Sequence, residues 1–310
     1  MRYTLLIPIF FLLFHINLNA QTDWSKFEKI ENISSSNPSE LAKKITQGFD
    51  TEKEKIQAIY YWITHNIKYD YKIVKKHAKL KHGKRKKYSP QGIKDKRTKL
   101  ITTALKRKKG VCQDYSYIFE TMCNEIGVEV DFIGGISKSG SKHAWNKVVL
   151  DGKTYFVDAT YGAGGLNDKH KFAFDFKPNF LFVEPELFII NHFPSDEKNQ
   201  ALESPVSKDE FKKFPRIGAG FFKYKIKNLN HLEKKIVVSK KHKLNIQFTS
   251  NEPLENFRCF NVKNSKKLDI EVSNTDLNYT ITVDYKKLRS GKYVFLVGDD
   301  VLFYYRIVKE

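Results

Sequence analysis

The chain has 310 residues, with 55 lysines and arginines against 35 aspartates and glutamates, which gives a net charge of +20. This length is sufficient for two domains, and three cysteines are too few for a secreted fold held together by disulfides. The positive charge favours anionic partners, but it carries no information about the fold.

The first twenty residues have the pattern of a secretory signal peptide. Arg2 supplies a positive charge, residues 5–14 form a short apolar core, and Leu18-Asn-Ala20 is a permissible cleavage site. The apolar core is shorter than the about 20 residues that a membrane-spanning helix needs. We therefore expect cleavage after Ala20 and a secreted or periplasmic mature chain without a transmembrane span.

After a polar lead-in at residues 21–50, a helix is predicted to begin at Thr51. Thr51 and Glu54 have the spacing of a capping box, in which each residue satisfies a backbone N–H of the other. The apolar residues that follow keep the spacing of one helical face: Ile56, Ile59, Tyr60, Ile63 and Ile67.

Residues 72–109 are the most basic part of the chain, with seventeen lysines and arginines and a single acid, Asp95. One interpretation is a loop that binds a polyanion such as an acidic cell-envelope polymer. We favour a solvated insertion in a generally basic protein. Aromatic residues do not alternate with the basic ones as in single-strand binders, so no nucleic-acid partner is expected. His77 and His82 lack neighbours that would complete a metal site.

The stretch around Cys112 predicts a nucleophile at the start of a helix. The free N–H groups and the macrodipole at a helix N-terminus stabilise a thiolate, and the basic run at residues 106–109 acts in the same direction. Cys123 is expected to be a core residue of the same helix. The apolar stripe of that helix, which Gly127 ends, consists of Tyr115, Ile118, Phe119, Met122 and Ile126.

A hairpin is predicted to bring two further polar residues together. Asp151-Gly152 is a strong signal for a two-residue type I′ turn between strands at residues 143–150 and 153–160. The register that this turn imposes makes His143 and Asp158 diagonal neighbours on one face of the sheet.

Cys112, His143 and Asp158 are therefore the expected catalytic residues. An aspartate that holds one imidazole nitrogen, while the other nitrogen faces a thiolate, is the general arrangement of nucleophile, base and orienting group. Further candidates to line the site are Trp145, Gln113 and Asn146.

Three motifs together resemble the transglutaminase-like superfamily, which belongs with the papain-like cysteine proteases. They are Gly110-Val-Cys112-Gln-Asp-Tyr-Ser, His143-Ala-Trp-Asn and Val157-Asp158-Ala-Thr-Tyr-Gly-Ala-Gly164. The resemblance covers roughly residues 51–215, and it implies that Cys112, His143 and Asp158 form the catalytic triad of the family. Within the superfamily the chain is most similar to the kyphoscoliosis-peptidase branch, on the evidence of Tyr69-Asp70, Phe180-Leu181, Pro185, Phe188-Ile189 and His192-Phe193-Pro194.

Two positions depart from the pattern of that branch. Asp114 replaces a common glycine, although Asp is usual in other transglutaminase-like members. Asn199 stands where a tryptophan is common. Neither position belongs to the triad, so the departures bear on local packing.

The connecting segments carry weaker signals. Residues 128–133 are predicted as a strand, and residues 137–142 as a polar loop that leads to His143. Residues 172–193 are rich in aromatic residues and interrupted by prolines, which is typical of short strands or turns over a core. Residues 208–215 are predicted as a short helix that ends the domain.

From about residue 218 the pattern has period two with frequent turns, which suggests an immunoglobulin-like β-sandwich. The predicted fold is thus α+β: a papain/transglutaminase-like core at residues 51–217, in which the nucleophile helix packs on an antiparallel sheet, followed by an all-β sandwich at residues 218–310. The expected strands of the sandwich are residues 221–226, 235–238, 243–249, 257–262, 268–272, 278–283, 292–297 and 301–308.

Together these features predict an exported cysteine-dependent acyl-transfer enzyme. It would be a peptidase or amidase if water accepts the acyl group, and a transglutaminase if an amine does. The expected partners are a protein or peptide substrate and a cell-envelope polymer, and no cofactor or metal is expected. Two alternatives remain open: a catalytically idle scaffold or binding protein of the cell envelope, and a basic polyanion-binding protein that uses residues 72–109.

Overall fold

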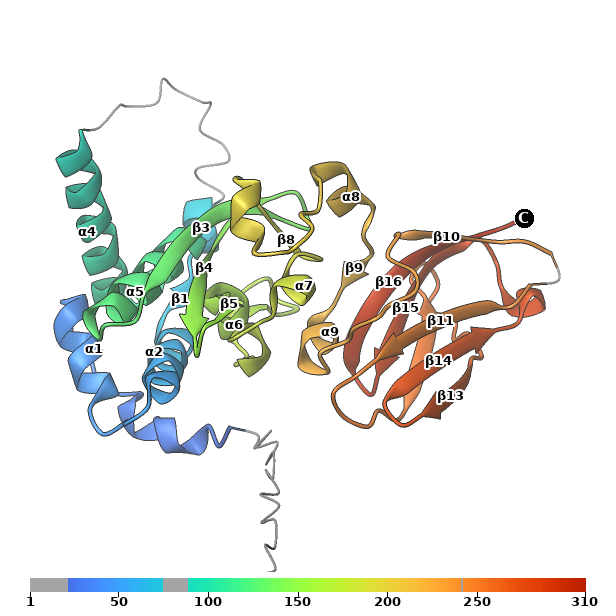
Figure 1. Cartoon of the computed structure of the whole chain (residues 1–310), viewed down its shortest axis with the longest axis horizontal. Helices are drawn as coiled ribbons and strands as arrows, with labels where there is room; N and C mark the ends of the chain where they lie inside the picture. Colours follow the sequence, from blue (N-terminus) through green and yellow to red (C-terminus); the bar gives the residue numbers. More distant parts are fainter. Residues whose placement is uncertain (1–21, 75–88, 241) are drawn as a thin grey trace, which may run out of the picture.

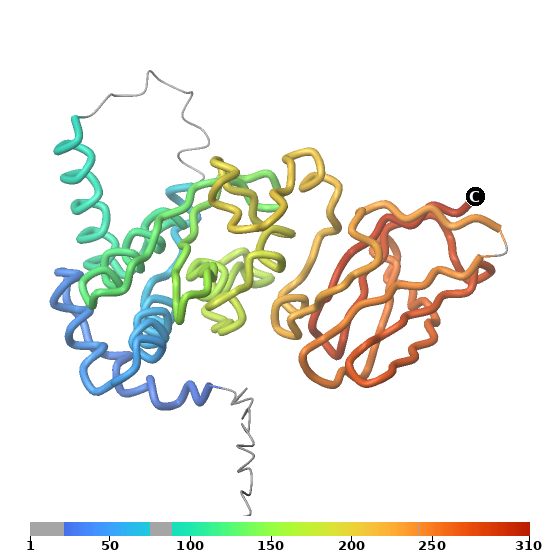
Figure 2. Tube along the Cα trace, in the orientation of Figure 1, coloured from blue at the N-terminus to red at the C-terminus, as the bar shows by residue number. Residues whose placement is uncertain are grey.

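A computed structural model describes residues 22–74, 89–240 and 242–310 of the chain. It has an N-terminal part in which helices surround an antiparallel sheet and a C-terminal part made mainly of strands (Figures 1 and 2). The α+β fold class is therefore as predicted. The predicted signal peptide and residues 75–88 of the basic segment lie outside the described residues. No helix within the described ranges is long and apolar enough to cross a membrane.

The helix at Thr51 begins as its sequence predicts. The Thr51 hydroxyl accepts the N–H of Glu54 at 3.1 Å, and the Glu54 carboxylate accepts the N–H of Thr51 at 3.4 Å. The longer helices of this part pack around the helix that starts at Cys112. In chain order, after a short 3-10 helix η1 (Ser25–Ile30), the surrounding helices are α1 (Pro38–Thr46), α2 (Glu52–Asn66) and α4 (Pro90–Arg107). The helix that they surround is α5 (Cys112–Glu125).

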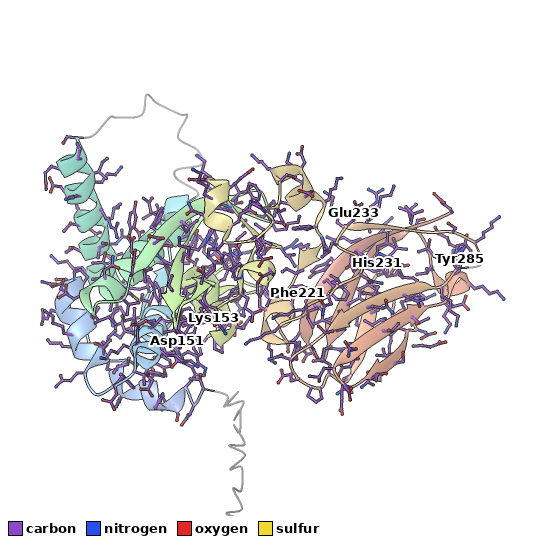
Figure 3. The ribbon with its side chains drawn as sticks, in the orientation of Figure 1. Asp151, Lys153, Phe221, His231, Glu233 and Tyr285 are labelled. Carbon is purple, nitrogen blue, oxygen red and sulfur yellow. The ribbon has the colours of Figure 1, made fainter. Side chains whose placement is uncertain are left out.

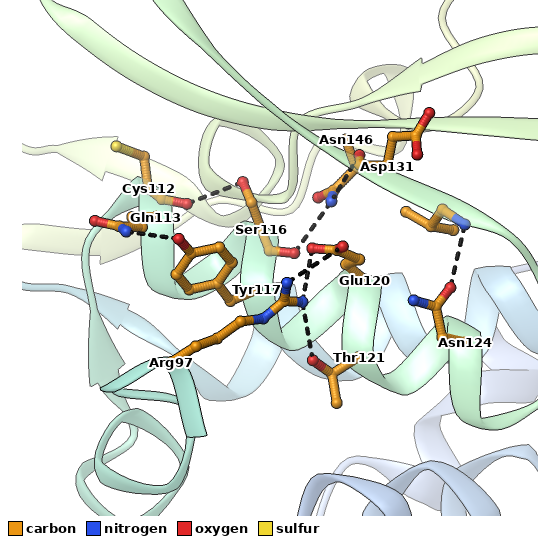
Figure 4. Close-up of polar contacts among 11 residues, drawn as sticks. Arg97, Cys112, Gln113, Ser116, Tyr117, Glu120, Thr121, Asn124, Asp131 and Asn146 are labelled. Atoms are coloured by element: carbon orange, nitrogen blue, oxygen red, sulfur yellow. Dashed lines mark hydrogen bonds and ion pairs between the residues drawn. The ribbon is translucent and has the colours of Figure 1, made fainter. Parts of the chain in front are cut away.

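The second half of the basic segment, which was expected to be a solvated insertion, is a helix, α4, and one side of it is packed on the core. Three of its apolar residues, Ile101, Ala104 and Leu105, are buried, and the helix packs against α5. Arg97 reaches Glu120 on α5 with an Nη2–Oε2 distance of 2.7 Å (Figure 4). Three apolar residues at helical spacing are enough to dock a helix whose other positions are basic. The helix was not predicted because these three apolar residues stand among many lysines and arginines in the sequence.

The central sheet contains the predicted hairpin. Asp151 and Gly152 both have positive φ, at 51° and 71°, as a type I′ turn requires, and Figure 3 labels Asp151 at this turn. The ladder ends where Asn146 pairs with Val157, so the second strand is shorter than the predicted residues 153–160. The four strands, in spatial order, are β5 (Lys153–Val157), β4 (Lys142–Leu150), β3 (Val130–Ser137) and β8 (His192–Pro194).

A short helix replaces the predicted end of that second strand. Asp158 is its N-cap, because its side chain accepts the N–H of Tyr161 at 2.9 Å. An aspartate satisfies a free N–H group at a helix start better than it continues a strand. The helix is α6 (Ala159–Ala163).

Close packing at Gly135 brings β8 to the sheet. Gly135 pairs with His143 on one side and with Pro194 on the other. A Cβ atom here would collide with the carbonyl of Phe193 and with the ring of Trp145. The strand predicted at residues 128–133 therefore continues to Ser137 and includes both glycines.

The remaining short elements of the N-terminal part lie over this core. Residues 172–193 contain short strands, as predicted, but also one-turn helices at Pro178 and Pro185, and the helix predicted at residues 208–215 is present. These elements are β1 (Lys68–Tyr69), β2 (Lys109–Gly110), β6 (Gly164–Leu166), β7 (Phe172–Phe174), η2 (Pro178–Phe180), α7 (Pro185–Phe188), η3 (Glu197–Gln200) and α8 (Lys208–Lys213).

Two sheets make up the C-terminal part. The larger sheet contains β10 (Lys235–Val238), β16 (Asp300–Lys309), β15 (Gly291–Val297) and β12 (Phe257–Asn261) in that order, and β9 (Arg216–Ile217) also pairs with β16. The smaller sheet contains β11 (Leu244–Thr249), β14 (Asn278–Val283) and β13 (Glu271–Thr275), with the 3-10 helix η4 (Tyr285–Lys287) after β14.

The strand predicted at residues 221–226 is wrong. This segment begins as the helix α9 (Ala219–Lys223), in which the neighbouring residues Phe221 and Phe222 are both buried. A strand would direct them to opposite faces, whereas one helical turn at the junction between the two parts buries both. Phe222 contacts Phe180 of η2, with ring centroids 4.9 Å apart, and Figure 3 shows Phe221 at this junction.

The packing at Gly135 gives a test of the fold. We expect Gly135→Ala to reduce the free energy of unfolding by about 1–3 kcal/mol, because the added methyl group forces β8 and Trp145 apart. Gly134→Ala is the matched control, since its Cβ would meet nothing closer than the Phe132 ring at 3.7 Å. Urea unfolding of both variants measures the difference, and equal midpoints would contradict this packing.

Candidate active site

Backbone pairing fixes the segment that precedes Cys112. β1 and β2 form a parallel pair, in which Lys68 donates to the carbonyl of Lys108 at 2.9 Å and Asp70 donates to that of Gly110 at 2.8 Å. The Tyr69-Asp70 motif, in and just after the strand that follows α2, therefore holds the residues just before the nucleophile in place.

Asp114 closes the start of α5. Its Oδ2 accepts the N–H of Val111 at 2.9 Å, so the residue that departs from the family pattern forms a hydrogen bond at the helix start. The side chain packs closely on Gly110, where a Cβ would lie 2.7 Å from the Asp114 Cβ. Cys112 is the first residue of this helix and is partly exposed, as a nucleophile must be, while Cys123 and Cys259 are buried. All three cysteines are free.

Two of the predicted site-lining residues have other contacts. Asn146 is buried, and its Nδ2 donates to the carbonyl of Ser116 in α5 at 3.1 Å (Figure 4). It projects from the opposite face of β4 to His143, because side chains alternate along a strand. Asn146 thus attaches the nucleophile helix to the sheet. Gln113 is exposed and donates to the Tyr117 hydroxyl at 2.9 Å.

His143 and Asp158 meet as the hairpin register predicts. The distance from His143 Nε2 to Asp158 Oδ2 is 2.6 Å, and both side chains are buried. Asp158 is further fixed by its Oδ1, which accepts the N–H of Tyr161, and by its own N–H, which donates to the carbonyl of Phe180 at 2.9 Å. The Tyr161 ring stacks on the imidazole of His143, with ring centroids 4.8 Å apart.

The charge on His143 depends on its neighbours. Burial lowers its pKa, but the charge and hydrogen bond of Asp158, together with a hydrogen bond and charge from Cys112, raise it to about 10 overall. Since Nε2 is engaged by Asp158, Nδ1 is the nitrogen that remains for the Cys112 thiol. At neutral pH the imidazole is therefore protonated and lies between a thiol and a carboxylate.

A second histidine also contacts Asp158. His192 in β8 is completely buried, and its Nε2 lies 3.0 Å from the same Oδ2 atom. Burial raises the pKa of Asp158, but the charge of His143 and the hydrogen bonds from both imidazoles lower it below its usual range. Sequence reasoning did not place His192 in the site. Its only signal was the His-Phe-Pro motif of the kyphoscoliosis-peptidase branch.

His143, Asp158 and His192 also have the composition of a metal site, since their ligand atoms lie within 4.8 Å of one another. Ligands around a tetrahedral zinc ion are separated by about 3.3 Å, because each lies about 2 Å from the metal. The distances of 2.6 and 3.0 Å to the carboxylate oxygen are those of hydrogen bonds. The geometry is therefore that of a carboxylate hydrogen-bonded by two imidazoles, and it is too tight around this oxygen for a metal ion between the groups.

Aromatic residues cover the site on two sides. Trp145 is 1% exposed, and its ring lies edge-on to His192 with centroids 5.1 Å apart and 6.0 Å from that of His143. Tyr69 lies on the side of the nucleophile, where burial and then the charge and hydrogen bond of Cys112 raise its pKa. Sequence reasoning used Tyr69 only as part of a motif and missed its position beside Cys112.

Comparison with known proteins agrees with these motifs. Residues 39–159 match the family model of the transglutaminase-like superfamily. This part of the chain, residues 39–159, is thus a transglutaminase-like domain. It is 32% identical over 206 residues to kyphoscoliosis peptidase from Homo sapiens and 31% identical to that from Mus musculus. Both alignments cover 61% of this chain and 29% of the relative, so the chain spans under a third of the length of these proteins.

A crystal structure of a TGase is also similar, with 18% identity and a TM-score of 0.32, covering 50% of this chain and 36% of that one. The family model and the two peptidases confirm both the superfamily and the branch that the sequence motifs indicated.

The imidazole of His143 should make stability depend on pH. Because Asp158 helps to raise its pKa from 6.5 to about 10, protonated His143 stabilises the fold fully below pH 6.5, and this contribution is lost as the pH rises towards 10. In Asp158→Asn the buried imidazole has no carboxylate to stabilise its charge, so this loss should be absent.

Urea unfolding at pH 6, 8 and 10 measures this difference. Lysines also titrate near pH 10, so the quantity that matters is the gap between the wild type and Asp158→Asn at each pH. A gap that stays constant across this range would show that His143 gains no proton affinity from Asp158.

Proposed function

We propose that this chain is an exported cysteine-dependent acyl-transfer enzyme, with a peptidase reaction on protein or peptide amides. Cys112 is the nucleophile, His143 the general acid and base, and Asp158 the orienting group. The observation that carries the proposal is the 2.6 Å contact between His143 and Asp158, beside a cysteine that begins a helix. The relatives at 32% and 31% identity are named as peptidases, which supports hydrolysis over transfer to an amine.

The first half-reaction forms an acyl-enzyme. The Cys112 thiolate attacks the carbonyl carbon of the substrate, and a C–S bond forms while the carbonyl oxygen becomes negative. Helix starts leave their first N–H groups without intrahelical partners, so the backbone N–H of Cys112 is the donor that we assign to this oxyanion. His143 then gives its Nδ1 proton to the amine as the C–N bond breaks.

The second half-reaction releases the product. Neutral His143 takes a proton from water, and the resulting hydroxide equivalent attacks the thioester carbon. The C–S bond breaks to regenerate the Cys112 thiolate and protonated His143. Asp158 stays ionised throughout, because its role is to orient the imidazole and to stabilise its positive charge.

We extend the proposal to the rest of the chain in two respects. Residues 1–20 are proposed as an export signal on their sequence pattern alone. The C-terminal part, from about residue 218, is proposed as an immunoglobulin-like accessory domain. Its support is the strand order, since β11, β14 and β13 form one sheet and β12, β15 and β16 belong to the other, as strands B, E, D and C, F, G do in that fold.

The reactivity of Cys112 tests whether the site is active. We expect iodoacetamide to label Cys112 rapidly already at pH 6, because the neighbouring imidazolium stabilises the thiolate. Cys123 and Cys259 should remain unlabelled in the folded chain, since both are buried. Mass spectrometry of tryptic peptides measures the three rates separately.

His143→Ala is the control for this experiment. It should delay labelling of Cys112 until the pH exceeds about 8, the range of an ordinary thiol. If the wild type already behaves in that way, the site is idle, and the scaffold alternative is the better interpretation of the fold.

A second experiment separates hydrolysis from transamidation. The enzyme is incubated with a glutamine-containing peptide and a labelled primary amine. We expect new peptide termini, no incorporated amine, and loss of turnover by at least about a thousandfold in Cys112→Ala. Amine incorporation without cleavage would assign a transglutaminase reaction instead.

A further inference from the structure

One carboxylate oxygen of the site forms hydrogen bonds with two imidazoles. Asp158 Oδ2 lies 2.6 Å from His143 Nε2 and 3.0 Å from His192 Nε2. A nucleophile–base–orienting arrangement requires only the first of these contacts. The second comes from β8, which lies 34 residues further along the chain and reaches the sheet only because Gly135 lets it approach.

The orientation of the second imidazole is fixed by its surroundings. The His192 ring stacks on Phe188 with centroids 3.8 Å apart and an interplanar angle of 11°, and Trp145 lies edge-on to it. Its Nδ1 has no hydrogen-bond partner of normal geometry within the described residues. Its Nε2 must carry a hydrogen in order to donate to Asp158. His192 is thus held as a donor to the carboxylate.

We propose that His192 is a positioning residue of this site, which holds Asp158 Oδ2 and takes up part of its negative charge so that His143 can release its proton. This assignment rests on the proposed function for its role in turnover, but its physical basis is independent of Cys112. A hydrogen bond to an ionised carboxylate stabilises the charged form and lowers its basicity. With His192 in place, Asp158 attracts the proton of His143 less strongly than it would alone.

The charges around Asp158 are consistent with this division of roles. If two imidazoles that contact the same oxygen are both positively charged, they repel each other, so one of them is expected to be neutral. Burial lowers the pKa of His192, although the hydrogen bond and charge of Asp158 and the backbone of Phe188 act in the opposite direction. The pKa of His143 is raised. The other titratable groups that face the pair within the described residues are Cys112 and four tyrosines whose pKa values burial raises: Tyr60, Tyr69, Tyr115 and Tyr161.

Two substitutions at His192 separate its donor role from its packing role. His192→Phe keeps an aromatic ring against Phe188 and removes the donor. His192→Gln places an amide N–H close to the position of Nε2 and removes the ring. Both are made in a Cys112→Ala background, so that ionisation of the thiol does not enter the measurement. Equal circular dichroism spectra would establish that both variants are folded.

The readout is a titration of the full chain with ¹⁵N-labelled histidine, followed by NMR. His143 and His192 are assigned by their absence in His143→Gln and His192→Phe. We expect His143 to be protonated and His192 neutral at pH 7. His192→Phe should raise the midpoint of His143 by about 0.5–1 pH unit, and His192→Gln should leave it unchanged.

Three results would overturn the proposal: an unmoved or lowered His143 midpoint in His192→Phe, a protonated His192 at pH 7, or a His192→Gln variant that behaves like His192→Phe. Failure of the proposed function is a separate outcome. It would appear as ordinary thiol reactivity of Cys112 in the iodoacetamide experiment, and the effect of His192 on His143 would still be visible in the titration.

Discussion

The buried carboxylate of Asp158 is the group on which the geometry of this site depends. A buried charge is costly unless it is paired and hydrogen-bonded, so the surrounding elements must provide donors. Here β4 provides His143, β8 provides His192, and α6 provides the N–H of Tyr161. The backbone N–H of Asp158 donates to Phe180 in η2. The convergence of these four elements on one residue explains why so many short segments are folded over the end of the sheet.

Those parts of the site that rest on local signals could be predicted from the sequence. The Asp151-Gly152 turn sets the hairpin register by itself, and that register brings His143 to Asp158. A capping box at Thr51 and an apolar stripe after Cys112 were likewise sufficient to define their helices. In each case the deciding interactions lie within a few residues, and the chemistry of those residues permits few alternatives.

The features that sequence analysis missed depend on contacts between distant segments. His192 reaches Asp158 only through the pairing of β8 with β3, and no local pattern reveals that pairing. The helix α9 was interpreted as a strand because the burial of both Phe221 and Phe222 reflects packing between the two parts of the chain. The helix α4 was missed for a related reason. Its three buried apolar residues stand among many lysines, and they are buried only because α4 packs on α5.

The two halves of the site are built from separate sets of hydrogen bonds. The nucleophile side is fixed by the β1–β2 pair and by Asp114, while the base side is fixed by the hairpin and by Asp158. Asn146 connects them, because it extends from the strand of His143 to the backbone of the Cys112 helix. The helix of Cys112 also packs directly on β4 and α6. This packing and the Asn146 hydrogen bond therefore set the relative position of the two halves, on which proton transfer between Cys112 and His143 depends.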